Sequence, residues 1–326
     1  MPVSQKAGDI LRGRYQINRI IGQGGMGSIY LADDLRLEGR QCALKEVEHD
    51  RSLPDDLLKE AREQFLREAT VLARLDQPNL PKVSDFFSIE GHDYLVMDFV
   101  PGKDLRALML GARQRKEFLS EAEVINWADQ LADALTYLHG QDTPILHRDI
   151  KPSNLKLTPS GLLKLVDFGL VKVLAPGEVT ITILQGQGTA LYTPLEQYGG
   201  DSAHSDVRTD IYAFGATLYH LFTNTAPAVA RERFLNPGCL TPIRKINPAI
   251  SARTERAIHW AMKLHPDERP ADIEEFRNSL QGNMPMRRSK QFSISAWAVL
   301  GSPTERILLV TTIGMAFLSL IATFVF

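Results

Sequence analysis

The chain has 326 residues, of which 44% are hydrophobic and 23% are charged, a composition typical of a globular protein with a sizeable core. Its formal net charge of −2 argues against nucleic acid as a partner, because proteins that bind nucleic acid usually present a basic face. Two cysteines, Cys42 and Cys239, are too few for a disulfide framework or a zinc site, and they favour a reducing compartment.

Residues 15–100 are predicted to form a small unit rich in strands. Short runs of apolar, β-branched and aromatic residues alternate with Gly, Asp and Pro at turns. The expected strands are 15–21, 28–32, 41–47, 83–89 and 94–99. One long helix is expected between the third and fourth strands, from about Pro54 to Leu75, because Pro suits a first helical turn and apolar residues follow with helical spacing.

From about residue 105 to residue 280 the apolar residues recur with the period of a helix. The clearest expected helices are 122–139, 211–222 and 254–264. Residues 281–306 have no such period and are predicted to be a linker. They contain four basic residues and one acidic residue, and four minus one gives a net charge of +3.

The last segment, 307–326, is twenty residues long and contains no charged residue. As a helix with ~1.5 Å rise per residue it would span roughly 30 Å, the thickness of a bilayer's hydrocarbon core. We therefore expect one transmembrane helix; the alternative is a buried core helix, which is rarely apolar on every face over such a length. Because an excess of Lys and Arg indicates the cytoplasmic flank, the linker predicts a single-pass membrane protein whose main body is cytoplasmic.

The first chemical motif is the string IGQGGMGSIY, in which Gly22, Gly24 and Gly27 form a G-x-G-x-x-G pattern. Glycines let a backbone approach phosphates closely and adopt positive φ, although the pattern alone also fits an ordinary turn. Residues 28–32 are β-branched and aromatic, so a strand follows the glycines. The pattern therefore predicts a hairpin turn that covers a nucleotide, and not the opening of a dinucleotide-binding helix.

The next strand carries Lys45 in the string CALKEV. An isolated Lys is usually a solvated surface residue, but the apolar neighbours Ala43 and Leu44 predict that this ammonium group points into a cleft. Glu68 lies on the apolar side of the expected long helix and is the predicted partner. An ion pair between Lys45 and Glu68 would aim the Lys at the α- and β-phosphates of ATP.

The string ILHRDIKPSN is far more specific. Asp149, Lys151 and Asn154 lie within six residues, Pro152 prevents a continuous helix between them, and Asp167 follows in VDFG. Phosphoryl transfer needs neutralised phosphate charge and an oriented hydroxyl group. Asn154 and Asp167 would supply oxygen ligands for Mg²⁺, Asp149 would accept the proton of the attacking hydroxyl group, and Lys151 would stabilise the transferred phosphoryl group.

With these strings, the chain resembles the eukaryotic-like Ser/Thr protein kinases of bacteria over residues 15–280. GQGGMGSIY is similar to the family's Gly-rich loop, CALK to its Lys motif, HRDIKPSN to its catalytic loop and DFG to its magnesium motif. The resemblance implies an α+β fold with a strand-rich N-lobe (about 15–100) and a helical C-lobe (about 101–280). It also implies transfer of the ATP γ-phosphate to Ser and Thr of proteins with Mg²⁺ or Mn²⁺, in signal transduction.

The resemblance further implies which residues surround the adenine. Met97 would be the gatekeeper, Asp98 to Val100 would form the hinge that binds adenine, and Ile21, Ile29 and Ala43 would line the adenine site. Lys156 departs from the family pattern, which commonly has an apolar residue beneath the adenine. Its aliphatic stem could fill that place while its charged end reaches solvent.

Other implied roles concern the frame of the site. Asp210 would anchor the backbone of the catalytic loop, and Thr189 would contact Asp149 and Lys151. Glu196 would pair with Arg269, although Pro-Leu-Glu stands where the family has Ala-Pro-Glu. A hydrophobic spine is implied to link the lobes through Leu72, Val83, His147 and Phe168.

Regulation is expected in the loop between Asp167 and Glu196. An Arg before the catalytic Asp, here Arg148, commonly binds a phosphate on this loop, and Thr180 and Thr182 are the predicted phosphosites. The alternative is that these β-branched residues only keep the loop extended. Autophosphorylation between two copies would involve a homodimer, and the sequence leaves the oligomeric state open.

Two other functions were weighed. A pseudokinase, which signals by docking alone, usually lacks the Lys or one of the two Asp residues, whereas Lys45, Asp149 and Asp167 are all present. A small-molecule kinase of related fold generally lacks the segment that docks a protein substrate, whereas residues 188–198 retain it. The sequence therefore favours an active protein kinase.

Overall fold

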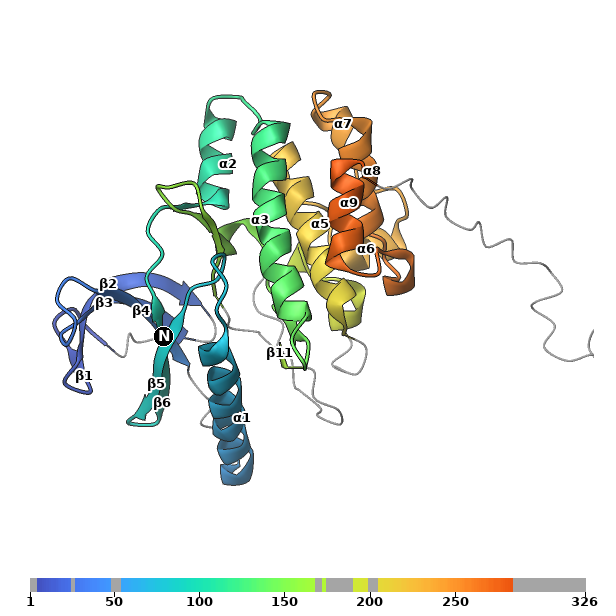
Figure 1. The fold of residues 1–326 in the computed structure, drawn as a ribbon. Coiled ribbons are helices and arrows are strands. Elements are labelled where there is room, and N and C mark those ends of the chain that lie inside the picture. The colour runs from blue at the N-terminus through green and yellow to red at the C-terminus, as the bar shows by residue number, and fades with distance from the viewer. Residues whose placement is uncertain are drawn as a thin grey trace, which may run out of the picture. The chain divides into compact units, whose positions relative to one another are not determined.

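The computed structural model describes residues 5–24, 27–47, 54–167, 172–173, 190–198 and 205–283. The chain divides into two units, Met1–Met284 and Pro285–Phe326, and every described residue belongs to the first. Within it, a sheet and one helix lie to one side of a bundle of helices, as Figure 1 shows. None of the helices formed by the described residues is long and apolar enough to cross a membrane. The predicted membrane segment, 307–326, lies outside these residues.

The N-lobe is built on one six-stranded antiparallel sheet in the order β1-β2-β3-β4-β6-β5. Its strands are β1 (Ile10–Leu11), β2 (Tyr15–Gly24), β3 (Gly27–Asp34), β4 (Gln41–Val47), β5 (Val83–Ile89) and β6 (His92–Asp98). The five predicted strands are confirmed. The two-residue strand β1 was not predicted, because it is too short to show an alternating pattern.

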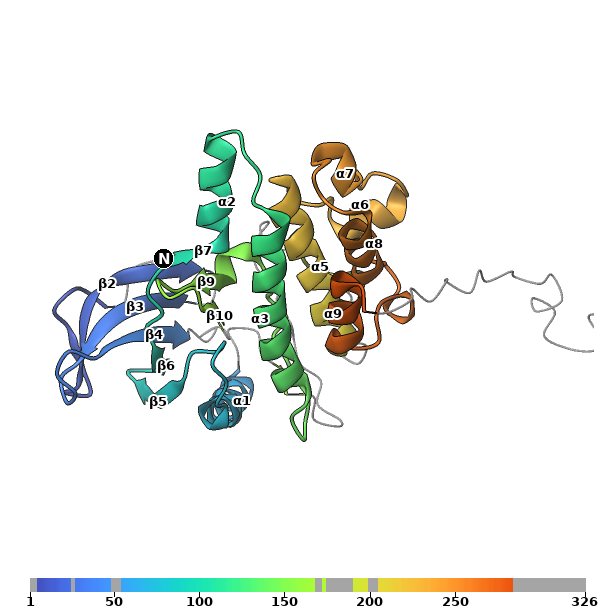
Figure 2. The same ribbon diagram turned by 45° about the horizontal axis from the view of Figure 1, so that its top comes forward.

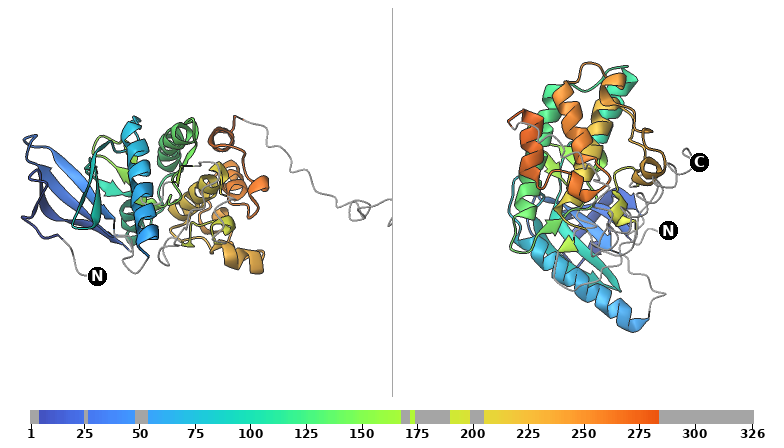
Figure 3. Two further views of the ribbon diagram at one scale, coloured as in Figure 1. Left: turned by 90° about the horizontal axis from the view of Figure 1, so that it is seen from below. Right: turned by 90° about the vertical axis from the view of Figure 1, so that its right-hand side faces the viewer.

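The predicted long helix is α1, Asp55–Arg74, which packs against β5. It lies beside the sheet in both views of Figure 3. Its residues Ala69 and Leu72 are buried in the core that both lobes share. The helix ends at Arg74, because Leu75 after it adopts an extended conformation. The helical spacing of apolar residues in the sequence stops one residue later.

The C-lobe is mainly helical, as Figure 2 shows. Its α-helices are α2 (Leu105–Gln114), α3 (Glu121–His139), α5 (Val207–Thr223), α6 (Ala230–Leu235), α7 (Ile243–Ile246), α8 (Ala252–Ala261) and α9 (Ile273–Gln281). The three helices predicted at 122–139, 211–222 and 254–264 are confirmed as α3, α5 and α8. Helix α5 is buried along most of its length and packs against α3 and α8, so it forms the centre of the lobe.

Short elements frame the junction of the lobes. They are the strands β7 (Lys103–Asp104), β8 (Ile145–Leu146), β9 (Leu155–Leu157), β10 (Leu163–Leu165) and β11 (Lys172–Val173), and the 3₁₀ helices η1 (Pro152–Asn154), η2 (Leu195–Gln197) and η4 (Pro266–Glu268). Strands β10, β9 and β7 form one small sheet, and β11 pairs with β8. Elements of two or three residues carry no periodic signal, so the sequence did not predict them.

One hydrophobic core runs through both lobes. Ala43, Leu72, Val83 and Met97 of the N-lobe belong to the same cluster as the buried residues of α3 and α5. His147, which the predicted spine includes, is fully buried between them. Phe168, the fourth residue of that spine, lies outside the described residues. The shared core joins the sheet of the N-lobe to the helices of the C-lobe.

Candidate active site

The catalytic loop runs from β8 to β9 and includes η1, whose helical turn begins at Pro152. The carboxylate of Asp149 accepts hydrogen bonds on Oδ2 from Lys151 Nζ at 2.8 Å and from Asn154 Nδ2 at 2.9 Å. Asn154 Nδ2 also donates to the backbone carbonyl of Asp149 at 2.8 Å. The other oxygen, Asp149 Oδ1, is buried and has no hydrogen-bond partner among the described residues. One oxygen is thus held by the loop, and the second is left to accept from a substrate.

Asp210 at the start of α5 anchors this loop, as the resemblance implied. Its Oδ1 accepts from the backbone N–H of Arg148 at 2.8 Å, and its Oδ2 from the N–H of His147 at 2.9 Å. His139 Nε2 lies 2.9 Å from the same Oδ2. Burial acts to raise the pKa of Asp210. The hydrogen bond with His139 and the charges of His139 and His147 outweigh burial, so the pKa is lowered. The buried carboxylate therefore stays ionised and keeps its acceptors available to both N–H groups.

Arg148 needs this support because its backbone has φ of 64°, in the left-handed region. A residue with a side chain pays roughly 1–2 kcal/mol there. Asp167 has φ of 71° and carries the same cost. Of the six non-glycine residues with positive φ in the described part of the chain, these two lie next to the chemistry, one before Asp149 and one in the magnesium motif.

Lys45 lies in the middle of β4, opposite Ile29 of β3 and Leu95 of β6. Its ammonium group is buried and forms an ion pair with Asp167 Oδ1 across the junction of the lobes. Burial acts to raise the pKa of Asp167, but the charge and hydrogen bond of Lys45 outweigh it, so the pKa is lowered. Lys45 is thus buried and points toward the C-lobe, while the cleft that the sequence predicts around it stays a prediction.

The predicted ion pair between Lys45 and Glu68 is not formed in this structure. Glu68 accepts from Gln64 Nε2 at 3.0 Å, one helical turn away on α1. Its charge instead acts on Arg148: burial lowers the pKa of Arg148, and the charges of Asp210 and Glu68 offset part of that effect. The correction has a physical reason. Asp167 competes for the same ammonium group, and the position of α1 decides which carboxylate reaches it.

Four of the residues expected around adenine belong to the shared hydrophobic core or pack against it: Ala43, Met97, Ile21 and Ile29. Ala43 pairs with Met97 in the register of β4 and β6, and both side chains are buried. The other lining residues are Ile21 and Ile29, which pack against the shared core, and Val100, which is buried. Asp98 belongs to the same segment, but its carboxylate accepts from Arg40 Nη2 at 3.4 Å and from the N–H of Lys82 at 3.3 Å. Its contribution to the hinge is therefore through the backbone.

The glycine hairpin joins β2 and β3. Gly22 pairs with Ile29, and Gly24 pairs with Gly27. Gly27 has φ of 127°, a conformation that side chains rarely adopt, so the glycine is required there. The hairpin itself is confirmed.

Lys156 lies on β9, between Asp104 of β7 and Lys164 of β10. Its ammonium group is 5.5 Å from the centre of the Phe99 ring. Burial lowers the pKa of Lys156. The residue is half-buried, and its charged end lies near the hinge aromatic Phe99; that this end reaches solvent stays a prediction.

The pair between Glu196 and Arg269 is confirmed. Arg269 donates from Nη1 and Nη2 to the two carboxylate oxygens at 2.6 and 3.0 Å. Its remaining donors bind backbone carbonyls, Nε that of Lys263 at 2.7 Å and Nη2 that of Leu264 at 2.9 Å. The substitution of Pro-Leu-Glu for Ala-Pro-Glu thus leaves the pair intact. The predicted contacts of Thr189 and the phosphosites Thr180 and Thr182 lie outside the described residues.

Sequence reasoning missed two interactions that support the site. Thr217 Oγ1 on α5 donates to the carbonyl of Ile150, next to Asp149, at 3.2 Å. The hydroxyl group of Tyr192, in the docking segment, is 2.6 Å from His220 Nδ1 on α5. Neither pair has a local signal, because the partners are 67 and 28 residues apart in the chain.

Two residues could hold a metal ion. Asn154 Nδ2 is committed to Asp149, which leaves the amide oxygen, and Asp167 carries an ionised carboxylate. The N–H of Val166 donates to the carbonyl of Asn154 at 2.8 Å. The backbone of Asn154 therefore lies beside the backbone that leads into Asp167. Two protein oxygens suit Mg²⁺, which usually takes its other ligands from phosphates and water.

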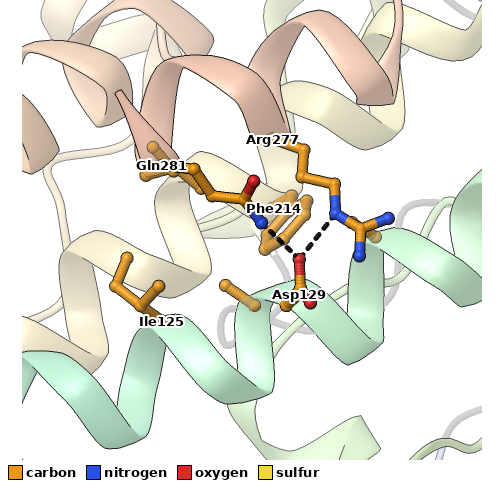
Figure 4. A pocket seen from close by; sticks show the side chains of 8 residues that line it. Ile125, Asp129, Phe214, Arg277 and Gln281 are labelled. Atoms are coloured by element: carbon orange, nitrogen blue, oxygen red, sulfur yellow. Dashed lines mark hydrogen bonds and ion pairs between the residues drawn. The ribbon is translucent and has the colours of Figure 1, made fainter. Parts of the chain in front are cut away.

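Figure 4 shows a small pocket elsewhere, lined by α3, α5 and α9. Asp129 accepts from Arg277 Nε at 2.5 Å and from Gln281 Nε2 at 2.8 Å. These bonds tie the last helix of the C-lobe to α3. None of the residues that line this pocket belongs to the predicted site, and we assign it a packing role.

Comparison with known proteins agrees with this geometry. A family model described as protein kinase domain matches residues 15–281. The probable serine/threonine-protein kinase PknB of Lactococcus lactis is 31% identical over 288 residues, which cover 86% of this chain and 44% of that protein. Serine/threonine-protein kinase PrkC of Bacillus subtilis is 33% identical over 296 residues, which cover 88% of this chain and 43% of that protein. The chain thus spans less than half the length of these relatives.

Solved structures show the same fold. The PknI kinase domain of Mycobacterium tuberculosis superposes with a TM-score of 0.64 at 27% identity, over 86% of this chain and all of that one. The apo form of PpkA-294 superposes with a TM-score of 0.68 at 29% identity, with the same coverage.

Proposed function

Because the chain belongs to the protein kinase family, among the bacterial eukaryotic-like Ser/Thr kinases, we propose that it transfers the γ-phosphate of ATP to Ser and Thr hydroxyl groups of proteins. One observation carries the proposal. Asp149 holds one carboxylate oxygen to Lys151 and Asn154, while the other is buried and has no partner among the described residues. A hydroxyl group that donates to this oxygen would satisfy it and would be oriented for attack.

Each of the other residues has one task in the proposed mechanism. Lys45 neutralises charge on the α- and β-phosphates, and Lys151 stabilises the phosphoryl group during transfer. Asn154 and Asp167 would hold Mg²⁺ or Mn²⁺, which when bound would neutralise further phosphate charge. Asp149 orients the hydroxyl group and takes its proton. The hydrophobic lining by Ala43, Met97 and Val100 receives the adenine.

Lys45 contacts Oδ1 of Asp167, so a metal ion that binds this oxygen would replace Lys45 there. We propose that α1 then brings Glu68 to Lys45, the pair that the sequence predicts, so that the ammonium group keeps a carboxylate partner. The two arrangements differ in which carboxylate contacts Lys45. The charge of Glu68, which acts on Arg148 in this structure, would move toward the phosphate site.

We further propose that the segment 307–326 anchors the protein in a membrane with residues 15–280 in the cytoplasm. An uncharged twenty-residue segment and a basic linker before it support this placement. Phosphorylation of one copy by another, through a transient homodimer, is the proposed route of activation.

The experiment is phosphate transfer from labelled ATP to a generic protein substrate. Asp149→Asn and Lys45→Met should each lower turnover by about a hundred- to a thousandfold, because each loses several kcal/mol of transition-state stabilisation. Asp76→Asn, an exposed carboxylate that pairs with Lys82, is the matched control and should keep wild-type turnover. Circular dichroism checks the fold of each variant. Near wild-type turnover of Asp149→Asn would overturn the proposed function.

A further inference from the structure

Helix α2 presents a basic face beside the catalytic loop. It packs against η1 and α5 through one buried face, whose residues are Leu105, Met109 and Ala112. Arg106 and Arg113, seven residues apart and hence two turns along one side, are exposed. Figures 1 and 2 show α2 at the end of the C-lobe where it meets the small strands.

Both arginines lie on α2, which packs against η1 of the catalytic loop and against α5, the helix that carries His220. The hydroxyl group of Tyr192 contacts His220 Nδ1 at 2.6 Å. Burial, followed by the charges of Arg106 and Arg113, lowers the pKa of His220 to about 4. For Tyr192, burial raises the pKa, the charge of Arg106 opposes this rise and the charge of Asp149 adds to it. The same hydroxyl group is therefore within electrostatic reach of both Arg106 and the catalytic carboxylate.

Neither arginine is used to hold the fold. Among the described residues, Arg106 and Arg113 form no ion pair, whereas Arg115 at the end of the same helix pairs with Glu117 at 2.7 Å. The nearby acids already have partners. Asp104 accepts from the N–H of Ala107 as the cap of α2, and Glu196 is held by Arg269. Among the described residues, the two guanidinium groups thus have no carboxylate partner, so each can bind a carboxylate of a peptide.

We propose that Arg106 and Arg113 select protein substrates that carry Asp or Glu close in sequence to the Ser or Thr that is phosphorylated. This inference rests on the proposed function and names its substrate class. A fixed positive charge attracts the carboxylates of an acidic substrate and repels the Lys and Arg residues of a basic one. Attraction and repulsion therefore both favour the acidic substrate. Guanidinium groups are suited to the task, because their planar donors match a carboxylate.

The test compares three peptides that share one Ser and differ only in their flanking residues: Glu, Lys or Gln. The full-length chain phosphorylates each, and kcat/KM is measured for each at low salt. An exposed ion pair changes such a ratio by about two- to fivefold, so two attractive pairs should favour the Glu peptide over the Lys peptide by about tenfold. The preference should shrink at 0.5 M salt, because ions screen exposed charges.

The double variant Arg106→Glu/Arg113→Glu should reverse the preference, toward the Lys peptide. The matched control is Arg115→Glu, which makes the same charge change on the same helix and should keep the wild-type preference. All ratios are taken within one variant, so a general loss of activity does not affect them. Equal use of the three peptides by the wild type, or equal shifts in the double variant and the control, would overturn the inference.

The outcome is separable from the proposed function. If the wild type phosphorylates all three peptides equally, the function holds and the charge preference fails. If it phosphorylates none, the function fails, and binding of the labelled peptides to the Asp149→Asn protein, measured by fluorescence anisotropy, still decides the preference. Tighter binding of the Glu peptide than of the Lys peptide, lost in the double arginine variant, would support it; equal binding would overturn it.

Discussion

The carboxylate of Asp210 accepts the backbone N–H of Arg148 at 2.8 Å and so holds a left-handed residue directly before Asp149. A second bond, from the N–H of His147, fixes the preceding peptide as well. The catalytic carboxylate is therefore positioned by a helix of the C-lobe, and not by its own loop alone. Strain of about 1–2 kcal/mol at Arg148 persists because these bonds offset it.

We expect Asp210→Ala to lower both stability and turnover. The substitution leaves two buried N–H groups without their acceptor and His139 without its partner, which should cost about 3–5 kcal/mol of unfolding free energy. Turnover should fall by about tenfold or more, since a small displacement of Asp149 misaligns the hydroxyl group. Urea unfolding and kcat report the two effects. The control is Asp206→Ala, which removes the partly exposed cap of α5; a similar loss of turnover there would contradict a specific role for Asp210.

A second prediction concerns pH. Burial beside Arg106 and Arg113 lowers the pKa of His220 from 6.5 to about 4. Between these values the unfolded chain binds the proton and the folded chain does not, so this group's stabilisation is complete above pH 6.5 and is lost as the pH falls toward 4. From pH 7 to pH 4.5, the unfolding free energy of the wild type should fall by about 1–3 kcal/mol more than that of His220→Gln.

Urea unfolding of residues 1–281 at several pH values measures the effect. His265→Gln, at an exposed position, serves as the control and should keep the wild-type slope. An unchanged slope in His220→Gln would contradict the prediction.

We predict that phosphorylation at Thr180 or Thr182 raises activity. A phosphothreonine adds about −1.5 to −2 charge and could bind Arg148. Burial lowers the pKa of Arg148, so an added negative charge nearby would stabilise its charged form. Mass spectrometry of protein expressed alone should find phosphate on one of the two residues, and none in Asp149→Asn protein. Replacing both threonines with Ala should lower turnover by about five- to a hundredfold, while Thr225→Ala, at an exposed position, should not. Full activity of an unmodified sample would count against the regulatory role.

The last prediction concerns the membrane. A chain cut after Gln281, where α9 ends before Gly282 adopts φ of 82°, should remain soluble, phosphorylate peptides and no longer sediment with membranes. The full-length chain should sediment and resist extraction by high salt, because an apolar helix and not charge would hold it. Aggregation or loss of activity in the shortened chain would instead indicate that the apolar segment packs against the kinase body.

The amino-acid sequence alone determined the strands of the N-lobe, the long helix α1 and the main helices of the C-lobe. These follow from the spacing of apolar residues along the chain, which is a local property. It also placed Asp149, Lys151 and Asn154 in one loop, because they lie within six residues of one another. Such short-range features require no knowledge of how the lobes pack.

Only the tertiary structure decided which charged groups meet. Lys45 contacts Asp167, 122 residues away, and not Glu68, because the position of α1 and the approach of the two lobes set those distances. The contact of Tyr192 with His220 depends in the same way on how the segment that contains Tyr192 packs against α5. Pairs so far apart in the chain leave no local pattern, since their energy depends on distance in the folded protein.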